Sequence, residues 1–423
     1  MLAGAAVADR DNRDADTRQT ERRRRKRGAM DKARAASAAV RERRTRLEQM
    51  GVNYFARRAK ALPSIELADP VHILNEEERR DLRRLQRGAI LRAFVVGAVA
   101  GGVVALAMLL FAPLNGDTWE ERVAYWTAVG GVGVISAIAE VAYMYWDSLR
   151  TVHSLAHCVG LDAFLSSDDR NTDVERSAVT AALARAALEL PNPPDQVFGV
   201  DPRRELSRWR LVMVTVFYKA KISLTNFVIK ALVRRMLGRA GVRTWLRFVG
   251  VPVTALWNCA VAWTVIRQAR IRVMGPSAAM EFVSVLVDPE KPISHQVRLT
   301  ALRAVGCTIV STKDLHPNLR ALLGHLHKRL GEPSEEGFDD RAKFLEEIRV
   351  LERPDQDLVL RILSVAVVID GRISRAERRL MRDTFAACGR DTDMTTLRRM
   401  RAGFVRGDRT PFELVLSIGQ EPG

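Results

Sequence analysis

The stretch that decides the fold is Ala93–Ala112, which reads AFVVGAVAGGVVALAMLLFA and contains no charged residue. Its length, about 20 residues, is what a helix needs to cross the hydrocarbon core of a bilayer. A second apolar stretch, VAYWTAVGGVGVISAIAEVAYMYW, follows at Val123–Trp146, and Glu140 is its only charged residue. The connection between them, residues 113–122, is short. We therefore predict a transmembrane helical hairpin made of these two stretches.

The charges on the two sides of this hairpin differ in sign. Before the first stretch, Asn75 and Glu78 have the spacing of a capping box, and the helix that they start is rich in arginine. Tryptophans and tyrosines at both ends of the second stretch suit the interfacial belts of a membrane protein. Because cytoplasmic loops are the ones rich in Lys and Arg, we expect both long flanks, and so both termini, on the cytoplasmic side. The short connection carries instead Asp117, Glu120, Glu121 and Arg122.

The composition favours a membrane surface as a partner. The chain of 423 residues has 67 Lys and Arg against 50 Asp and Glu, a formal net charge of +17, and 47% hydrophobic residues. A basic excess of this size favours phosphate-bearing partners, and the apolar stretches favour anionic membrane lipids over nucleic acid. The bias towards arginine and alanine is typical of a GC-rich bacterial genome, so we expect the bacterial cytoplasmic (inner) membrane.

Residues 1–70 are expected to form a basic, disordered tail and linker. A run of cations in it is the candidate lipid- or phosphate-binding site. A nucleic-acid tether is the alternative for this run, and its binding would fall steeply with salt. The run consists of Arg22, Arg23, Arg24, Arg25, Lys26 and Arg27.

The four cysteines lie far apart and form no CxxC pair. They are therefore expected to be free thiols in a reducing compartment, neither a disulfide framework nor a zinc site. They are Cys158, Cys259, Cys307 and Cys388.

Residues 151–290 are expected to form a membrane-associated helical region. Leu211–Leu237 mixes apolar stretches with cations, as helices at a membrane interface do. A third uncharged run, Phe248–Ile266, has cations on both sides. We therefore expect a re-entrant or interfacial hairpin there, or a buried helix, and a third crossing is the alternative. The pattern of Pro252, Asn258 and Ala269-Arg270 weakly resembles EcsC-type membrane-associated proteins.

The last region, 291–423, has the pattern of a soluble helical bundle. Ser294 can cap one helix, and the sequence His316-Pro317-Asn318 opens the next. Leu358–Ile369 is apolar on nearly all sides, so we expect this helix at the centre of the bundle.

The central helix runs into AVVIDGRISRAE, residues 366–377. An apolar helix, Asp-Gly, a hydrophobic residue, Ser, and then Glu at the next helix start resemble the tellurite-resistance TerB domain and the related DjlA N-terminal domain. The resemblance implies an all-helical bundle, often of two related halves, with an acidic patch of Asp370 and Glu377 able to bind a divalent cation. The other half, around Val297–Leu330, has no Asp-Gly signature.

The same residues also have a structural role that needs no ligand. Gly371 can adopt the left-handed conformation that ends a helix, and Ser374 with Glu377 can form a capping box for the next one. Because hard cations take six or more oxygen ligands, we favour this structural role, and no cofactor is expected.

Three further features are candidates for function. His153 and His157 share a helix face and could contribute to a metal site, although two ligands do not complete one. Glu140 is a functional candidate because ionisable groups in a membrane span usually face a bundle interior or an aqueous cavity. Its side chain could instead simply reach the membrane–water interface. Gly97 and Gly101 allow close helix packing, either within the hairpin, which we favour, or in a homo-oligomer.

No phosphate-binding glycine loop and no nucleophile motif is present in the sequence, and period-2 alternation is almost absent. We therefore predict an all-α protein without catalytic activity. It would consist of a transmembrane hairpin, membrane-apposed helices and a cytosolic TerB-like bundle that recruits an unidentified cytosolic protein, in envelope or metal stress. The alternative function is an oligomeric channel or transport element in which Glu140 lines a polar path.

Overall fold

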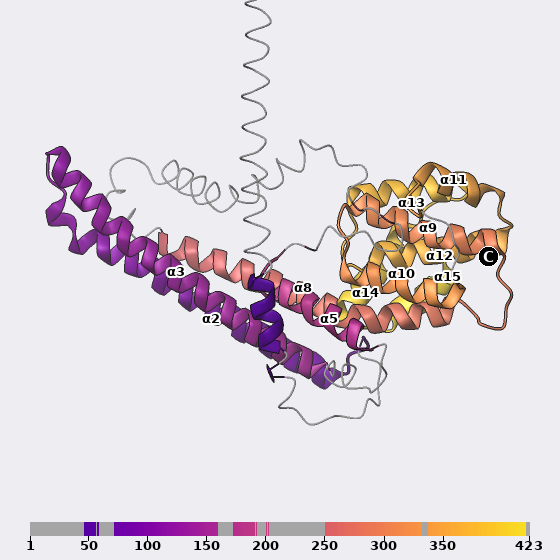
Figure 1. Cartoon of the computed structure of the whole chain (residues 1–423), viewed down its shortest axis with the longest axis horizontal. Coiled ribbons are helices and arrows are strands. Elements are labelled where there is room, and N and C mark those ends of the chain that lie inside the picture. The colour runs from indigo at the N-terminus through magenta and orange to yellow at the C-terminus, as the bar shows by residue number, and fades with distance from the viewer. Residues whose placement is uncertain are drawn as a thin grey trace, which may run out of the picture.

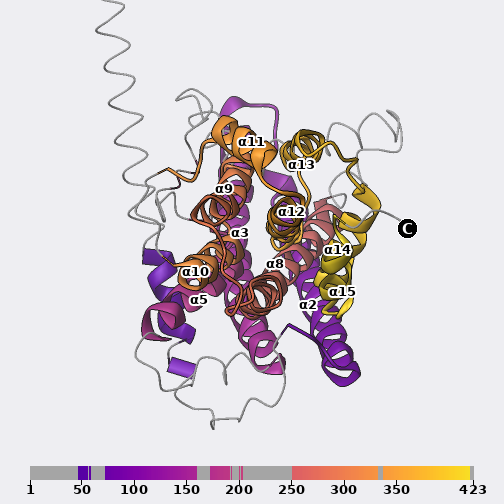
Figure 2. The ribbon, with the colours of Figure 1, turned by 90° about the vertical axis from the view of Figure 1, so that its right-hand side faces the viewer.

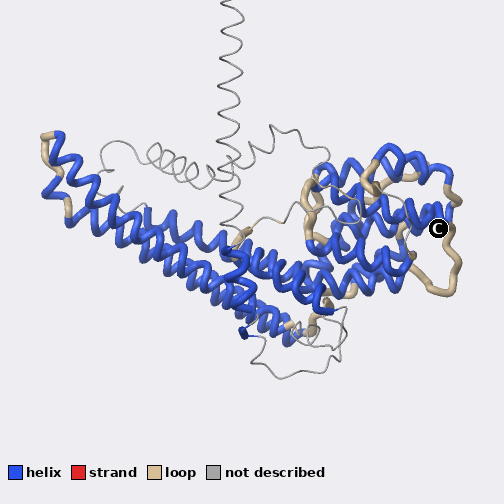
Figure 3. Tube along the Cα trace, viewed as in Figure 1, coloured by secondary structure: helices blue, strands red, loops and turns tan. Residues whose placement is uncertain are grey.

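The computed structural model is helical throughout the part of the chain that it describes (Figures 1 and 3). No β-strand occurs in these residues, so the predicted all-α class is confirmed. The described residues are 46–55, 57–58, 72–159, 172–190, 192, 200, 202, 250–331 and 337–419.

Two long antiparallel helices, α2 (Glu76–Leu110) and α3 (Trp119–Cys158), form a hairpin that projects from the rest of the molecule (Figure 1). Both begin with a capping box, as predicted for the first of them: Asn75 caps α2 and Thr118 caps α3. A short 3₁₀ turn, Ala112–Leu114, follows α2 at the tip. Both helices are long and apolar enough to cross a membrane.

A third long helix, α8 (Gly250–Leu286), lies along the hairpin and continues into the C-terminal bundle (Figure 1). Its first half packs on α2 and α3, and its second half packs on α10 and α12. The expectation of a re-entrant hairpin in the third apolar run is wrong for residues 250–266, because they belong to one uninterrupted helix. The alternative of a packed helix fits this arrangement. The shorter α5 (Thr172–Ala187) packs on α8 as well.

Seven shorter helices build the C-terminal bundle. The bundle is seen end-on in Figure 2, with α12 in its middle, as predicted from its apolar sequence. The helix starts expected from Ser294 and His316 are both present, since these residues are the N-caps of α9 and α10. The helices are α9 (His295–Thr312), α10 (Pro317–Leu330), α11 (Arg341–Val350), α12 (Arg353–Val368), α13 (Arg375–Ala387), α14 (Met394–Arg406) and α15 (Thr410–Ser417).

The core of the bundle includes the second half of α8. Met274 and Phe282 of α8 are fully buried, and the Phe282 ring stacks on Phe412, near the start of α15, at a centroid distance of 4.1 Å. The same hydrophobic core reaches back to Leu82 and Leu155 at the base of the hairpin. Hairpin base, α8 and bundle therefore form one packed unit across the predicted division at residue 290.

Candidate functional site

The candidate site is the turn between α12 and α13. Gly371 has φ 75°, and its N–H donates to the Val368 carbonyl at 2.9 Å, which closes the end of α12. The Ser374 hydroxyl accepts from the Glu377 N–H at 3.1 Å, and the Glu377 carboxylate accepts from the Ser374 N–H at 2.6 Å. The left-handed glycine and the capping box predicted here are both confirmed.

This turn brings two carboxyl groups into one largely buried place. The Glu377 side chain is fully buried, and its Oε1 has no hydrogen-bond partner in the described part of the chain. Asp370 is half-buried, and its Oδ1 accepts from the Arg372 N–H at 2.7 Å. Burial, together with the charge of Glu377, raises the pKa of Asp370 to about 8. Burial raises the pKa of Glu377 to about 7. Each of the two carboxyl groups is therefore protonated in a substantial fraction of molecules near neutral pH.

A divalent cation would find few ligands at this turn. Asp370 and Glu377 supply carboxylate oxygens, but no group of three or more His, Cys, Asp or Glu that could hold a metal occurs among the described residues. Hard cations take six or more oxygens. The fit of the two carboxyl groups to a resident metal is therefore poor, and the geometry supports a role in packing and proton binding.

The turn is docked on α8. The Arg267 guanidinium donates to the Gly371 carbonyl at 3.1 Å and lies 5.6 Å from the centre of the Trp263 ring. A β-carbon added at Gly371 would lie 2.5 Å from Cδ1 of Ile271. A glycine at this position therefore serves two purposes: the left-handed conformation and the close approach of α8.

Asn318 joins three helices immediately beside the turn. Its fully buried side-chain amide donates to the carbonyls of Ile271 in α8, at 2.9 Å, and of Ile369 after α12, at 2.7 Å. Gly275 makes room for it, since a β-carbon there would lie 2.0 Å from Cγ of Asn318. The sequence marks Asn318 only as part of a helix start, and no local signal indicates its long-range contacts.

None of the protein families, curated proteins or solved structures compared with this chain matches it. The resemblances to the TerB domain and to EcsC-type proteins therefore stay predictions, and the function of the site is argued from its own geometry.

Glu140 of α3 faces α8. Its Oε1 accepts a hydrogen bond of 2.7 Å from the side-chain amide of Asn258, and the Glu140 side chain is half-buried. A carboxyl group and an amide thus meet where both helices are otherwise apolar. This contact places Glu140 between α3 and α8, so its carboxylate faces the interior of the helix packing. A position facing an interior is one of the two alternatives from the sequence.

The glycines of the hairpin differ in what they contact. A β-carbon on Gly97 would lie 2.7 Å from Cα of Ala255, so this glycine lets α8 approach α2. Gly130 and Gly131 have nothing within 4 Å of such a carbon. The favoured interpretation of Gly97, packing within the hairpin, is corrected here: its close neighbour is the third helix.

Two further predicted sites are the histidine pair and the cationic run. The His153 ring stacks on Phe55 at 6.1 Å, while His157 is exposed, and no third potential metal ligand joins them within the described residues. The cations Arg22–Arg27 and the basic segment 211–237 lie outside the described residues. All four cysteines are free thiols, as predicted.

His72 makes a buried contact that no sequence pattern indicated. Its Nδ1 lies 2.8 Å from the Ser277 hydroxyl, and its Nε2 lies 2.7 Å from Oε2 of Glu281. Burial lowers the pKa of His72 to about 4, so the ring is neutral at pH 7. Ser277 is buried as well, at 6% exposure, which excludes a substrate from its hydroxyl. These residues fix the segment before α2 to α8.

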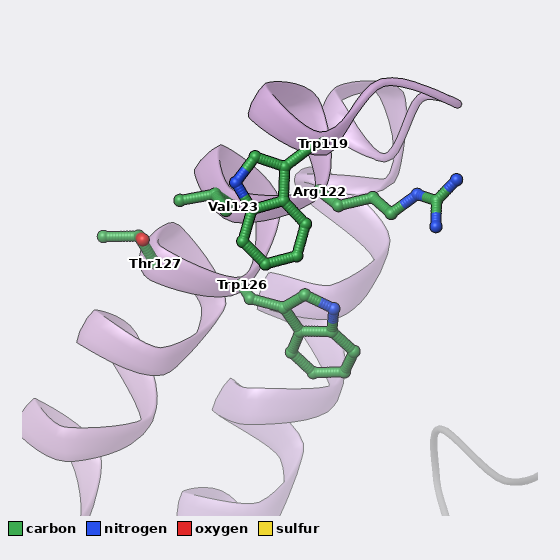
Figure 4. A pocket seen from close by; sticks show the side chains of 5 residues that line it. All are labelled: Trp119, Arg122, Val123, Trp126 and Thr127. Atoms are coloured by element: carbon green, nitrogen blue, oxygen red, sulfur yellow. The ribbon is translucent and has the colours of Figure 1, made fainter.

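A shallow recess lies at the other end of the molecule, on the first turns of α3 (Figure 4). Two tryptophans and an arginine dominate its lining, and Figure 4 shows their side chains projecting from one helix without convergent polar groups. The lining residues are Trp119, Arg122, Val123, Trp126 and Thr127. Exposed tryptophans at a helix end suit a membrane interface better than a substrate site.

Proposed function

We propose that this chain is a non-catalytic membrane protein that presents a cytosolic, TerB-like helical interaction and sensing module. One observation carries the proposal: α8 is a single helix that packs on the apolar hairpin with its first half and completes the core of the bundle with its second. The bundle, with any partner bound to it, is therefore joined to the hairpin by one continuous helix.

Exposed apolar side chains support insertion of the hairpin into a bilayer. Soluble proteins rarely expose large contiguous apolar patches. Trp126 and Trp146 bracket the apolar part of α3 and lie about 30 Å apart at 1.5 Å per residue, which is the thickness of the hydrocarbon core. The exposed large hydrophobic residues are Leu91, Phe94, Val95, Val99, Val103, Leu106, Leu109 and Leu110 on α2, with Trp119, Val123, Trp126, Val134, Ile135, Ile138, Val141 and Trp146 on α3.

The bundle sits at the base of the hairpin, opposite the tip (Figure 1). The Leu74 N–H donates to the Gly407 carbonyl at 3.0 Å, and Arg79 pairs with Asp408 at 2.8 Å. Because the base is the basic end, the positive-inside rule supports a cytosolic bundle in a bacterial inner membrane. A role in envelope or metal stress is supported by the resemblance to the TerB domain.

Thiol labelling of the full-length chain in membranes tests this topology. In a cysteine-free background, Asp117→Cys marks the tip and Arg379→Cys marks the exposed face of α13. We expect an impermeant maleimide to label the tip only from outside and α13 only from the cytosolic side, with both labelled after detergent is added. Labelling of both positions from the same side of intact vesicles contradicts the proposal.

The interaction module has its own test. Full-length protein with Asp370→Ala is compared with wild type for the cytosolic proteins that co-purify after cross-linking, and Asp391→Ala, near the end of α13, is the matched control. We expect one partner to be lost with the first variant alone. An identical set of partners from all three proteins contradicts a role of the turn in recruitment.

A further inference from the structure

Exposed arginines and tryptophans gather at the base of the hairpin, where the apolar part of each long helix ends. Arg83, Arg84 and Arg87 are exposed on α2, and Arg150 is exposed on α3. The Trp146 and Trp263 side chains are both 47% exposed. We name this set the basal belt: Arg83, Arg84, Arg87, Trp146, Arg150 and Trp263.

Contacts between α2 and α3 place their members of the belt at similar heights. The Arg92 guanidinium donates to Asp147 at 2.7 Å and to Thr151 at 3.1 Å, so this part of α3 is level with Arg92. At 1.5 Å per residue, Arg87 lies about 8 Å further towards the bundle. Arg150 lies between Asp147 and Thr151 in the chain and is therefore within about two helical turns of Arg87.

A contact between α2 and α8 places Trp263 at the same height. The Cys259 thiol lies 3.5 Å from the Ile90 carbonyl, which aligns the two helices there. Trp263 is about 6 Å further along α8 towards the bundle. The belt therefore crosses three helices within about 14 Å along the hairpin axis. This part of the hairpin lies at the bilayer surface if the hairpin spans the membrane.

The tryptophans of the belt are paired with cations. The guanidinium of Arg150 lies 5.6 Å from the centre of the Trp146 ring, and Arg267 lies 5.6 Å from the Trp263 ring. Such pairs suit the headgroup region, where an amphipathic ring and a cation are both stable. Arg267 also donates to the Gly371 carbonyl, so we do not count it among the lipid-binding cations.

Acidic residues are placed so that they do not neutralise the belt. The acidic residues of α2, Glu76–Glu78 and Asp81, lie on the bundle side of Arg83, Arg84 and Arg87. Asp147 of α3 is paired with Arg92, which is not a member of the belt. The contact between Arg84 and Asp81 is long, at 3.5 Å, and both side chains are exposed, so it is a weak ion pair. The tip of the hairpin, by contrast, carries more acidic than basic residues.

We infer that the basal belt binds the headgroups of anionic phospholipids in the adjacent leaflet, and that the tip has no such preference. Guanidinium groups bind phosphate oxygens through paired N–H donors, and the belt presents several of them beside interfacial tryptophans. The inference rests on the proposed membrane insertion, and it assigns lipid recognition to the helical base of the hairpin in addition to the predicted cluster Arg22–Arg27.

Spin-labelled lipids test the inference with the full-length protein in phosphatidylcholine vesicles. The fraction of motionally restricted label gives the relative affinity for labelled phosphatidylglycerol against labelled phosphatidylcholine. We expect wild type to prefer phosphatidylglycerol by about fivefold at low salt, which corresponds to about 1 kcal/mol. The combined variant Arg83→Gln, Arg84→Gln, Arg87→Gln should reduce this preference for phosphatidylglycerol, while Arg150 and the predicted cluster Arg22–Arg27 retain part of it.

The matched control removes the same number of exposed arginines from α13, which packs on α9, α11 and α12 on the side of the bundle away from α2 (Figures 1 and 2). Arg375→Gln, Arg379→Gln, Arg382→Gln should keep the wild-type preference. The inference is overturned if wild type shows no preference for phosphatidylglycerol, or if both variants lose the preference equally. In either case a motionally restricted component would still support membrane insertion. Absence of any restricted component with either lipid overturns the proposed membrane insertion itself.

Discussion

The side-chain amide of Asn318 donates a hydrogen bond of 2.7 Å to the carbonyl of Ile369, the residue directly before the Asp-Gly turn. The same amide donates to the Ile271 carbonyl at 2.9 Å, so both of its N–H groups are used on main-chain acceptors. One buried side chain therefore holds the end of α12 against the helix that continues to the hairpin. We regard this junction as the structural link between the candidate site and the hairpin.

Replacing this amide should loosen the junction. In Asn318→Ala two main-chain carbonyls each lose the hydrogen bond from Asn318, and each such loss costs about 1 to 2 kcal/mol. We expect the free energy of unfolding of the full-length protein in detergent to fall by about 2 to 4 kcal/mol, measured by urea denaturation. Asn115→Ala at the exposed tip is the control and should change it by less than about 0.5 kcal/mol. Equal stability of both variants would show that Asn318 does not hold the junction.

Gly371 should be the least replaceable glycine of the turn region. Gly371→Ala introduces a left-handed alanine, at about 1 to 2 kcal/mol, and also presses its β-carbon on Ile271. Gly389, with φ 69°, has the same backbone conformation but nothing within 4 Å of a β-carbon. We therefore expect Gly389→Ala to be destabilised by about 1 kcal/mol and Gly371→Ala by clearly more in the same denaturation experiment. A Gly371→Ala protein as stable as Gly389→Ala means that α8 does not press on the turn.

The buried carboxyl groups predict a pH dependence of stability. The folded-state pKa values of Glu377, about 7, and Asp370, about 8, lie above those of exposed carboxyl groups, so the folded state binds more protons. The free energy of unfolding should therefore fall as the pH rises from about 4 to about 8. Glu377→Gln keeps an acceptor for the Ser374 N–H but has no charge, so it should flatten this dependence.

Thermal denaturation should show the loss of stability that follows ionisation of Glu377. Ionising a carboxyl group with this pKa shift costs roughly 3 kcal/mol, so Glu377→Gln should raise Tm at pH 8 and leave it unchanged at pH 5. Glu346→Gln, at an exposed position of α11, is the control. A Glu377→Gln protein whose Tm follows the wild-type pH profile would contradict the burial argument.

Local patterns were sufficient for the helices and their ends. The capping boxes at Asn75 and Ser374, the left-handed Gly371 and the central α12 all follow from residues close together in the chain, because capping and amphipathicity are short-range effects. The two long apolar helices could also be predicted locally, because about 20 uncharged, apolar residues in a row match the length of a membrane-spanning helix.

Contacts between segments that are distant in the chain could not be predicted from local sequence patterns. Nothing near Gly97 in the sequence indicates Ala255 as its neighbour, and nothing near His72 indicates Ser277. Cations on both sides of the third apolar run favour a re-entrant segment when only the sequence is known. A helix whose second half is buried in a helical bundle can also carry arginines, which then bind groups on neighbouring helices. Arg267, which donates to Gly371, is one of these.

Glu140 has a different role in each of the two functions considered: helix packing in an interaction module, or lining a polar path in a channel. A double-mutant cycle with Asn258, together with a flux measurement, distinguishes these roles. If the pair serves packing, Glu140→Ala leaves an unpaired amide among apolar helices and should lower stability in detergent by about 1 to 3 kcal/mol. Glu140→Gln keeps an acceptor for Asn258 and should be close to wild type. Removing both partners in Glu140→Ala, Asn258→Ala should recover part of the loss, because no unpaired polar group remains.

In vesicles we expect ion flux no greater than in empty ones for wild type and Glu140→Gln alike. A flux in wild type that Glu140→Gln abolishes would favour the channel alternative, since a packing contact preserved by the amide has no reason to carry ions.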